Sequence, residues 1–291
     1  MKIFVSGASG LVGGNCLSYF RAKKVDVVGS HLSYMTPDTV YFNTLSPGDA
    51  GNFDIAAFRP DIIVHCGALT HVDYCEQHPE ESYEKTVQST LNLVEAAREC
   101  GSTLVLLSTD YVFDGREGPY KETDAVNPLS VYGRHKLEAE REVIKSGLPY
   151  LILRVTNVYG DELRHKNFVS RIVEQCYNRQ HLTLKLPYDQ FASPTNAMDI
   201  ARAMYELLLH DKTGIYHICG SDFMNRVELA LKVIGYFPGT SYTLEAVSTE
   251  QLGQPAARPL IGGFVKQKFV REFPEFTFTS LDNYLQSKIK S

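Results

Sequence analysis

Short runs of apolar residues alternate with longer stretches of helical periodicity along the chain. Apolar runs bounded by turn residues are typical of buried strands, and apolar residues three or four apart are typical of amphipathic helices. The runs predict strands at residues 2–6, 25–29, 39–42, 61–67, 103–108, 150–155 and 214–219. The periodic segments predict helices at residues 14–24, 80–100, 131–145 and 197–210.

This alternation of strand and helix is typical of a doubly wound, mostly parallel sheet. Residues 103–108 are apolar almost throughout, as expected of a strand that helices cover on both faces. After Val155 the turn residues no longer divide the chain into regularly alternating strands and helices. We therefore expect an α/β protein of the Rossmann type. Its nucleotide-binding domain would span residues 1–158, joined by part of 190–220, and a smaller mixed α/β C-terminal lobe over 159–291 would bind substrate.

The composition of the 291 residues fits a soluble globular protein, because 44% are hydrophobic and 22% are charged. The formal net charge of −5 argues against the basic surface that nucleic acid or an anionic membrane requires. No apolar stretch approaches the length of a membrane span, and the glycine-rich segment at Gly7 leaves no room for a signal peptide. We expect a cytoplasmic protein that binds neither nucleic acid nor membrane.

Six cysteines are scattered along the chain without a C-x-x-C pair, which favours reduced thiols. His65, Cys66, His71 and Cys75 lie close together in the sequence. Their spacing suits no common metal site, and adjacent residues of a strand point to opposite faces. We predict neither a disulfide nor a bound metal.

The segment Gly7–Gly13, with the sequence GASGLVG, connects the first predicted strand to the first predicted helix. At such a junction the first glycine permits a tight turn, the second lets the backbone approach a pyrophosphate, and the third allows close packing of the helix. Backbone N–H groups at the helix N-terminus then hold the anion. Gly7, Gly10 and Gly13 therefore predict a dinucleotide-binding site.

The end of the second predicted strand bears on the choice of dinucleotide. An Asp or Glu about 20 residues beyond the glycine loop would bind the adenosine ribose of NAD, and neither stands there. Ser30, His31 and Ser33 could instead face the 2′-phosphate of NADP, although no arginine accompanies them. The sequence therefore favours NADP(H) and leaves NAD(H) open.

Tyr132 and Lys136 stand four residues apart, so the helix predicted over 131–145 places a phenol and an ammonium on one face. A neighbouring cation favours the phenolate and lowers the pKa of a tyrosine, which is ordinarily about 10. Tyr132 would then exchange a proton with the oxygen of a carbonyl that accepts hydride. Thr109 ends a predicted strand at the edge where such sheets bind ligands, so its hydroxyl is a candidate donor to the same oxygen.

The segment Ser108–Gly115, with the sequence STDYVFDG, strongly resembles the dTDP-4-dehydrorhamnose reductase family of extended short-chain dehydrogenases/reductases. The likeness spans nearly the whole chain and continues through ETD at 122–124, PLSVYG at 128–133, VYG at 158–160, SPT at 193–195 and ARP at 257–259. The resemblance implies a two-lobed reductase that moves hydride from a nicotinamide cofactor to the 4-keto group of a nucleotide-linked deoxysugar. Extended reductases are often dimers, so a homodimer is a fair expectation.

The same resemblance implies roles for individual residues. Tyr132 is the implied proton donor, Lys136 its electrostatic partner and a ligand of the nicotinamide ribose, and Thr109 the ligand of the carbonyl. The implied cofactor contacts are Gly10, Leu11 and Val12 at the diphosphate, Asn43 near the adenine, and Ala68, Leu69 and Thr70 on the nicotinamide side. The implied substrate contacts are Val72, Asp73 and Asp110 beside the sugar, and Arg258, whose guanidinium suits a pyrophosphate.

Three positions depart from the family pattern: Asn43 replaces an aspartate, Gln88 an asparagine, and Asn157 a tryptophan that packs on the sugar. Around Asn157 the sequence RVTNVYG is more similar to extended epimerases and dehydratases, in which this asparagine contacts the substrate diphosphate. An amide offers hydrogen bonds where a ring offers an apolar face, so the sugar need not be rhamnose.

Two other functions stay open. The family also resembles the non-catalytic partner of methionine adenosyltransferase, so one alternative is a cofactor-binding regulatory subunit. The other, prompted by Asn157, is an epimerase that retains NAD and shows no net oxidation. The presence of Thr109, Tyr132 and Lys136 favours a reductase.

Overall fold

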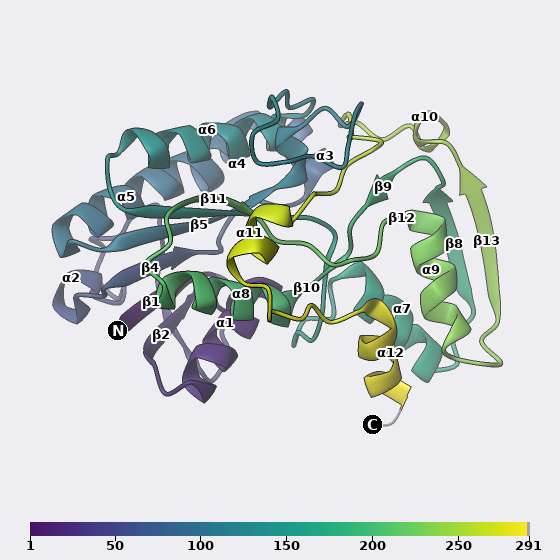
Figure 1. The fold of residues 1–291 in the computed structure, drawn as a ribbon, viewed down its shortest axis with the longest axis horizontal. Coiled ribbons are helices and arrows are strands. Elements are labelled where there is room, and N and C mark those ends of the chain that lie inside the picture. Colours follow the sequence, from purple (N-terminus) through teal and green to yellow (C-terminus); the bar gives the residue numbers. More distant parts are fainter. Residues whose placement is uncertain (290–291) are drawn as a thin grey trace.

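The structure is a computed structural model that describes residues 1–289 (Figure 1). Its centre is a seven-stranded sheet of order β11-β6-β5-β4-β1-β2-β3, in which every neighbouring pair is parallel. The strands are β1 (Lys2–Ser6), β2 (Asp26–His31), β3 (Thr39–Tyr41), β4 (Ile62–His65), β5 (Thr103–Thr109), β6 (Tyr150–Val155) and β11 (Gly214–His217). The predicted doubly wound parallel sheet is confirmed.

The central strands bury side chains on both faces of the sheet. On β1, Ile3 and Val5 contact one hydrophobic core and Phe4 contacts another. Because both faces are covered, these strands must be apolar at nearly every position, and this is why the sequence pattern predicts them. The covering helices lie above and below the sheet in Figure 1: α5 (Ser89–Cys100) and α6 (Val131–Lys145) on one side, α1 (Leu11–Ala22) and α8 (Ala197–Leu209) on the other.

The helix predicted over residues 80–100 is interrupted. In its place the chain forms α4 (Pro79–Tyr83), a π-helical turn at Glu84–Gln88, and then α5. A π-turn holds one more residue than an α-turn, so it changes the direction in which the side chains of α4 point relative to those of α5. Ser82 of α4 thereby meets His135 of α6, with 2.8 Å between Oγ and Nδ1.

The strand order reverses between β1 and β4, which are neighbours in the sheet. Sheets of this type bind ligands outside the carboxyl ends of the strands at such a reversal. The loops that follow the two strands touch there, since a Cβ on Gly7 would lie 2.9 Å from the backbone nitrogen of Gly67. The reversal therefore places the glycine turn and the loop after β4 around one crevice.

A second, smaller core lies at the right of Figure 1. The parallel strands β8 (Leu182–Pro187) and β13 (Tyr242–Val247) pack there with α7 (Phe168–Tyr177), α9 (Arg226–Gly235) and α12 (Leu281–Ile289). In chain order, α8 and β11 come between elements of this core, yet they belong to the central sheet and its covering layer. The chain thus passes between the two cores more than once, and the boundary at residue 158 stays a prediction.

Two short strand pairs connect the cores. One is parallel, between β7 (Val158–Tyr159) and β10 (Thr195–Asn196), and one is antiparallel, between β9 (Phe191–Ala192) and β12 (Met224–Asn225). The other short elements are α2 (Ile55–Phe58), α3 (Val72–Gln77), a 3₁₀ turn at Asp110–Val112, α10 (Thr249–Leu252) and α11 (Gln267–Glu272).

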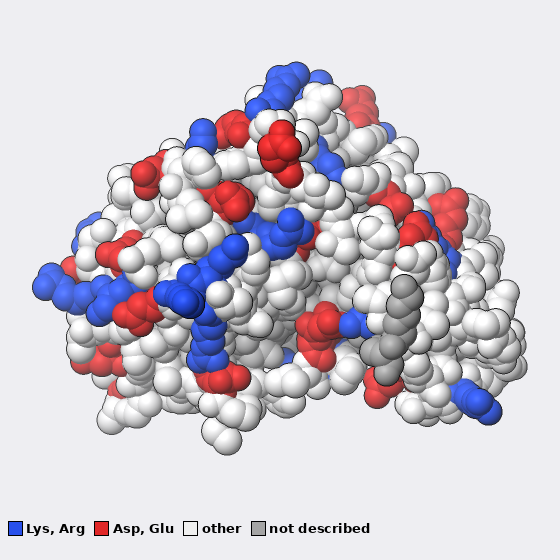
Figure 2. Space-filling model, turned by 60° about the horizontal axis from the view of Figure 1, so that its bottom comes forward, with Lys and Arg blue, Asp and Glu red and all other residues white. Residues whose placement is uncertain are grey.

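Several sequence expectations concern the surface and the thiols. No helix within residues 1–289 is both long and apolar enough to cross a membrane. All six cysteines are free, and the described residues hold no group of three or more His, Cys, Asp or Glu side chains that could bind a metal ion. The face turned forward in Figure 2 carries basic side chains with acidic ones beside them.

Candidate active site

Contacts that exclude larger side chains shape the glycine turn. Gly7 has a φ of +75°, a conformation that favours glycine. A Cβ on Gly13 would lie 2.4 Å from the Gly7 carbonyl oxygen, so α1 packs this closely only because residue 13 is glycine. Gly10 is the N-cap of α1 and no side chain caps the helix. The first N–H groups of α1, at Leu11 and Val12, are thus left for an anion, an arrangement that fits a pyrophosphate.

The residues predicted to choose between the dinucleotides differ in exposure. Ser30 and His31 are buried, and the His31 Nδ1 lies 2.8 Å from the Thr39 hydroxyl oxygen. Ser33, just beyond β2, is exposed. Asn43, beyond β3, accepts a hydrogen bond within its own turn through its side-chain oxygen. Of the three residues predicted near the 2′-phosphate, Ser33 is therefore the one whose side chain is open to solvent.

The residues predicted on the nicotinamide side form the loop between β4 and α3. Ala68 and Leu69 are half-buried, Thr70 is exposed, and the half-buried Val72 begins α3. This loop directly follows Gly67, the residue that touches the glycine turn. The fold therefore brings the loop to the same crevice as the predicted diphosphate site, and the individual contacts stay predictions.

Helix α6 begins in close contact with the turn that follows β5. The Ser130 hydroxyl caps the helix by accepting a hydrogen bond from the Gly133 N–H at 3.2 Å. A Cβ on Gly133 would lie 2.3 Å from the Tyr111 carbonyl oxygen, so only glycine allows this approach. As a result the Tyr132 ring stands edge-on to the Tyr111 ring, with 5.5 Å between the ring centroids.

The Lys136 side chain is buried, and its ammonium group is anchored to the sheet. Its Nζ donates a 2.5 Å hydrogen bond to the Leu107 carbonyl oxygen in β5. Burial lowers the pKa of Lys136 to about 8, and the Glu140 carboxylate, one helical turn further along, opposes that shift. The ammonium is therefore charged at neutral pH but loses its proton far more easily than an exposed lysine.

The Tyr132 pKa differs from the sequence expectation. Burial raises the pKa of Tyr132, and a hydrogen bond with the Thr109 side chain lowers it only in part. The expected net lowering of this pKa is wrong in this structure, because burial of the phenol outweighs the effects that favour the phenolate. Tyr132 is thus a neutral phenol, which is the form that donates a proton.

Thr109 and Asp110 lie together at the carboxyl end of β5, where both are buried. The Thr109 hydroxyl donates to Asp110 Oδ1 at 3.2 Å, and the Thr156 hydroxyl donates to Asp110 Oδ2 at 2.5 Å. Burial raises the pKa of Asp110, while these two hydroxyls lower it. The structure thus brings the Thr109 hydroxyl to the phenol of Tyr132 and engages Asp110 with two threonines.

Asp73 and Arg258, both predicted to contact substrate, contact each other. Arg258 Nη1 donates to Asp73 Oδ1 at 2.9 Å, and Nη2 donates to Asp73 Oδ2 at 2.8 Å. The pairing with Arg258 lowers the pKa of Asp73. Much of the hydrogen-bonding capacity that was predicted to hold the substrate pyrophosphate is therefore committed to a carboxylate of this chain.

Asn157 lies between β6 and β7, at the same sheet edge. Its φ of +40° is a left-handed conformation, which Asn adopts more readily than most other side chains. The Asn157 carbonyl oxygen also accepts a hydrogen bond from the Thr195 N–H at 3.4 Å. The backbone alone thus favours asparagine here, and contact of its amide with substrate stays a prediction.

Three residues of this region had no assigned role in the sequence analysis: Tyr111, Thr156 and Arg226. The first two stand inside the motifs STDYVFDG and RVTNVYG, so the motifs could have indicated them. Arg226 belongs to no such motif. It reaches the region through the pairing of β12 with β9, which only the tertiary structure reveals.

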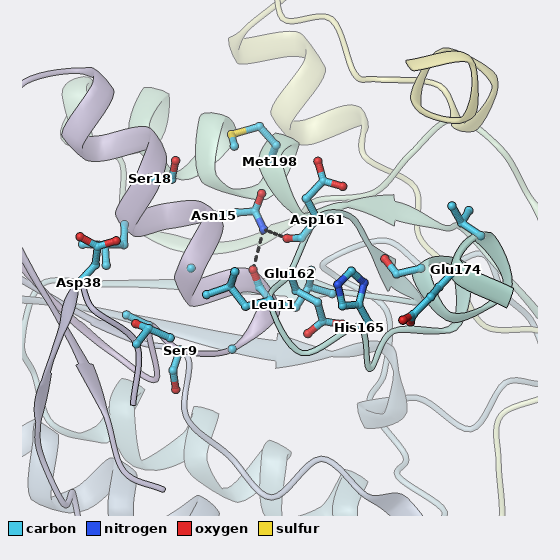
Figure 3. A pocket seen from close by; sticks show the side chains of 18 of the residues that line it. Ser9, Leu11, Asn15, Ser18, Asp38, Asp161, Glu162, His165, Glu174 and Met198 are labelled. Carbon is cyan, nitrogen blue, oxygen red and sulfur yellow. Dashed lines mark hydrogen bonds between the residues drawn. The ribbon is translucent and has the colours of Figure 1, made fainter. Parts of the chain in front are cut away.

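A hollow of about 930 Å³ lies beside the glycine turn. Figure 3 shows it with Ser9 and Leu11 on one side and Asp161, Glu162 and His165 on another. Asn15 of α1 joins these two sides by donating a 2.9 Å hydrogen bond to the Asp161 carbonyl oxygen. Thr109, Tyr132 and Lys136 are not among its lining residues, so the hollow adjoins the predicted diphosphate end of the site.

Comparison with known proteins extends over almost the whole chain. A family model described as the RmlD substrate binding domain matches residues 1–286. The chain is 32% identical over 263 residues to methionine adenosyltransferase 2 subunit beta of Danio rerio, an alignment that covers 89% of this chain and 80% of that protein. It is 34% identical over 186 residues to a dTDP-4-dehydrorhamnose reductase of Aggregatibacter actinomycetemcomitans, covering 62% of each.

Among solved structures, the dTDP-4-dehydrorhamnose reductase of Bacillus anthracis in complex with NADP superposes with a TM-score of 0.84 at 25% identity. That superposition covers 100% of both chains. The relatives thus carry two different names, a reductase and a subunit of methionine adenosyltransferase.

Proposed function

Because this chain belongs to the family of the RmlD substrate binding domain, we propose that it is an NADP(H)-dependent reductase of the 4-keto group of a nucleotide-diphospho-6-deoxysugar. The observation that carries the proposal is the packing of α6 against β5, where Thr109 at the strand end interacts with Tyr132 and the buried Lys136 ammonium hydrogen-bonds to the same strand. The reductases of A. actinomycetemcomitans and B. anthracis, the latter in complex with NADP, support the reaction class and the cofactor.

The glycine turn fits the cofactor that this reaction needs. The uncapped N-terminus of α1 offers the N–H groups of Leu11 and Val12 to a diphosphate, beside Gly10. Ser33 would face the adenosine 2′-phosphate, while NAD(H) stays the alternative because no arginine stands in the turn after β2. Bound NADPH supplies the hydride, and the loop of Ala68, Leu69 and Thr70 would flank its nicotinamide.

The residues of this chain then handle the proton. As the carbon of the keto group accepts hydride, the developing negative charge on its oxygen takes the proton of the neutral Tyr132 phenol. The Thr109 hydroxyl, once its proton turns away from Asp110 Oδ1, donates a hydrogen bond to the same oxygen. The buried Lys136 ammonium stabilises the phenolate that Tyr132 becomes, because charges interact more strongly away from water.

The test offers NADPH and NADH separately with a panel of dTDP-, GDP- and UDP-linked 4-keto-6-deoxysugars and follows the cofactor absorbance. We expect turnover with NADPH and at least one of these sugars. Tyr132→Phe should lower kcat about 10²- to 10⁴-fold while leaving the affinity for NADPH unchanged, since it removes only the proton donor. Absence of turnover with every sugar would overturn the proposal, and tightly bound NAD without consumption of NADPH would favour an epimerase instead.

The identity with methionine adenosyltransferase 2 subunit beta supports a second candidate function, that of a cofactor-binding regulatory subunit. The two functions separate in the Tyr132→Phe variant. A regulatory subunit would change the kinetics of a methionine adenosyltransferase catalytic subunit equally well with Tyr132 or Phe. A reductase would lose its own turnover in that variant and leave the adenosyltransferase kinetics unchanged.

A further inference from the structure

Arg226 comes from the second core but lies beside the segment that carries Arg258. It is the first residue of α9 and follows β12, whose Asn225 pairs with Phe191 of β9. Phe191 in turn donates a 2.6 Å hydrogen bond to the Leu260 carbonyl oxygen, two residues beyond Arg258. The three segments therefore run side by side and connect the second core to the candidate active site.

The Arg226 side chain is half-buried, with its guanidinium carbon 5.4 Å from the centroid of the Phe168 ring. Throughout residues 1–289, no carboxylate lies within salt-bridge distance of this guanidinium and no group accepts a hydrogen bond from it. Burial lowers the pKa of Arg226, Tyr111 and Asp110 oppose that shift, and Arg258 and Arg171 add to it. The group is therefore a partly desolvated cation without a paired carboxylate in the described part of the chain, with Asp110 and two further arginines in its surroundings.

The nearby carboxylates are engaged by other groups and form no ion pair with Arg226. Asp73 is held at both oxygens by Arg258, and Asp110 accepts hydrogen bonds from Thr109 and Thr156. A guanidinium removed from water without an anionic partner is energetically unfavourable. Its planar fork of donors matches the paired oxygens of a phosphate group. Among the described residues the Arg226 guanidinium thus lacks an anionic partner, which a bound phosphate group would supply.

Tyr111 relates this cation to the reacting centre. The Tyr111 ring packs edge-on against the Tyr132 ring, with 5.5 Å between the ring centroids. The positive charges of Arg258 and Arg226 both act on Tyr111, so the two arginines and the proton donor are grouped around this residue. In a nucleotide sugar the diphosphate lies across the sugar ring from the 4-keto group, so a sugar held at Tyr132 would direct its diphosphate toward this basic region.

We propose that Arg226 binds the diphosphate of the substrate, as the cation that the Asp73–Arg258 pair leaves available. We thereby assign to Arg226 most of the pyrophosphate binding that the sequence analysis predicts for Arg258. Arg226 then selects nucleoside-diphosphate sugars over sugars that carry no diphosphate. The placement of the sugar ring rests on the proposed reductase function, whereas binding of a nucleoside diphosphate to Arg226 does not.

The experiment measures binding by calorimetry to protein saturated with NADP⁺, so that the glycine turn is filled. The probes are UDP and dTDP, with uridine and thymidine as ligands that lack phosphate. Arg226→Gln should weaken UDP or dTDP about 10- to 100-fold and leave nucleoside binding unchanged. Arg226→Lys should lie between, because an ammonium keeps the charge but loses the fork. Arg271→Gln, at an exposed arginine on α11, is the matched control and should bind as the original protein does.

Thermal unfolding midpoints of the variants separate misfolding from loss of the cation, and Arg226→Lys serves where Arg226→Gln unfolds early. Equal weakening of nucleosides and diphosphates, or no change at all, would overturn the inference. Arg226-dependent diphosphate binding in a protein without keto-sugar turnover supports it and contradicts the reductase function. Turnover with an unaltered substrate KM in Arg226→Gln overturns the inference and leaves the reductase function standing.

Discussion

Asp73 and Arg258 stand 185 residues apart in the chain and form a two-point ion pair, with nitrogen–oxygen distances of 2.9 and 2.8 Å. Ala256 joins them, since its N–H donates to Asp73 Oδ1 at 3.2 Å and its carbonyl oxygen accepts from Arg258 Nη1 at 2.9 Å. The two side chains are only 21% and 10% exposed. The pair therefore fastens the C-terminal segment to α3 across the candidate site.

Asp73→Asn should show how much the Asp73–Arg258 ion pair contributes to the free energy of unfolding. We expect the free energy of unfolding at neutral pH to fall by about 1–3 kcal/mol, because the Arg258 charge loses its anion. Arg258 holds the pKa of Asp73 below the ordinary 3.8, so the stabilisation is complete above that value and is lost as the pH falls through the lower folded pKa. Denaturant unfolding at neutral and acidic pH should show the difference between the two proteins shrinking in acid. A difference that stays constant would contradict an electrostatic origin.

Lys136 predicts how activity responds to alkaline pH. Its pKa of about 8 means that kcat for the reduction should fall as the pH rises through about 8, when the ammonium loses the charge that stabilises the Tyr132 phenolate. In Lys136→Arg the cation persists at every accessible pH, so kcat should be lower throughout but should lack this decline. Both are read from pH–rate profiles. The same decline in both proteins would assign it to another group.

Unfolding would not explain that decline. The unfolded chain binds the Lys136 proton up to the ordinary pKa of 10.5, whereas the folded chain releases it near 8. Between these values the unfolded state holds more protons, so this residue makes the protein more stable, not less, as the pH rises. Thermal unfolding midpoints across the same pH range provide the check for the contribution of Lys136, by comparison with Lys136→Arg.

Gly13→Ala should show whether the close contact between α1 and the glycine turn stabilises the protein, beyond the general effect of replacing a helical glycine by alanine. The new Cβ would lie 2.4 Å from the Gly7 carbonyl oxygen, so α1 must move away from the turn. We expect a loss of about 1–3 kcal/mol in the free energy of unfolding, together with weaker NADP⁺ binding by calorimetry. Gly235→Ala is the matched control, because a Cβ there meets nothing within 4 Å at the end of α9. Equal behaviour of the two variants would show that the turn tolerates a side chain.

The sequence pattern predicts an element correctly where burial and helical spacing within that segment determine its structure. The central strands are apolar at nearly every position because helices cover both faces, and helix α6 has the bounds that its periodicity indicated. Tyr132 and Lys136 share a region because residues four apart in a helix lie on one face. The π-turn at Glu84–Gln88 escaped prediction, since the apolar periodicity runs on across it.

Long-range contacts decided what the sequence could not show. No spacing relates Asp73 to Arg258 or places Arg226 near them, because a side-chain ion pair and a strand pairing between distant segments create these two relationships. The Tyr132 pKa was misjudged for the same reason. Its direction depends on how deeply the phenol is buried, and burial is not a property of the Y-x-x-x-K motif.

The buried pair of Arg154 and Glu140 links stability to the charge of Lys136. Arg154 Nε and Nη2 donate to the two Glu140 oxygens at 3.0 and 2.6 Å, with the side chains only 3% and 1% exposed. Glu140→Gln leaves a buried guanidinium without its anion and should cost about 3–5 kcal/mol of unfolding free energy. It also removes the carboxylate that raises the pKa of Lys136.

The alkaline decline of kcat should therefore move to lower pH in Glu140→Gln, because the Lys136 ammonium loses a supporting negative charge. Glu142→Gln on the same helix is the control, since Glu142 pairs at 2.8 Å with Lys145, whose side chain is 74% exposed. That control should change the unfolding free energy by less than about 1 kcal/mol and leave the pH profile unchanged. If Glu140→Gln does not fold, Glu140→Leu combined with Arg154→Met removes both charges and should still shift the decline. An unshifted decline in a folded Glu140 variant would show that Glu140 does not act on Lys136.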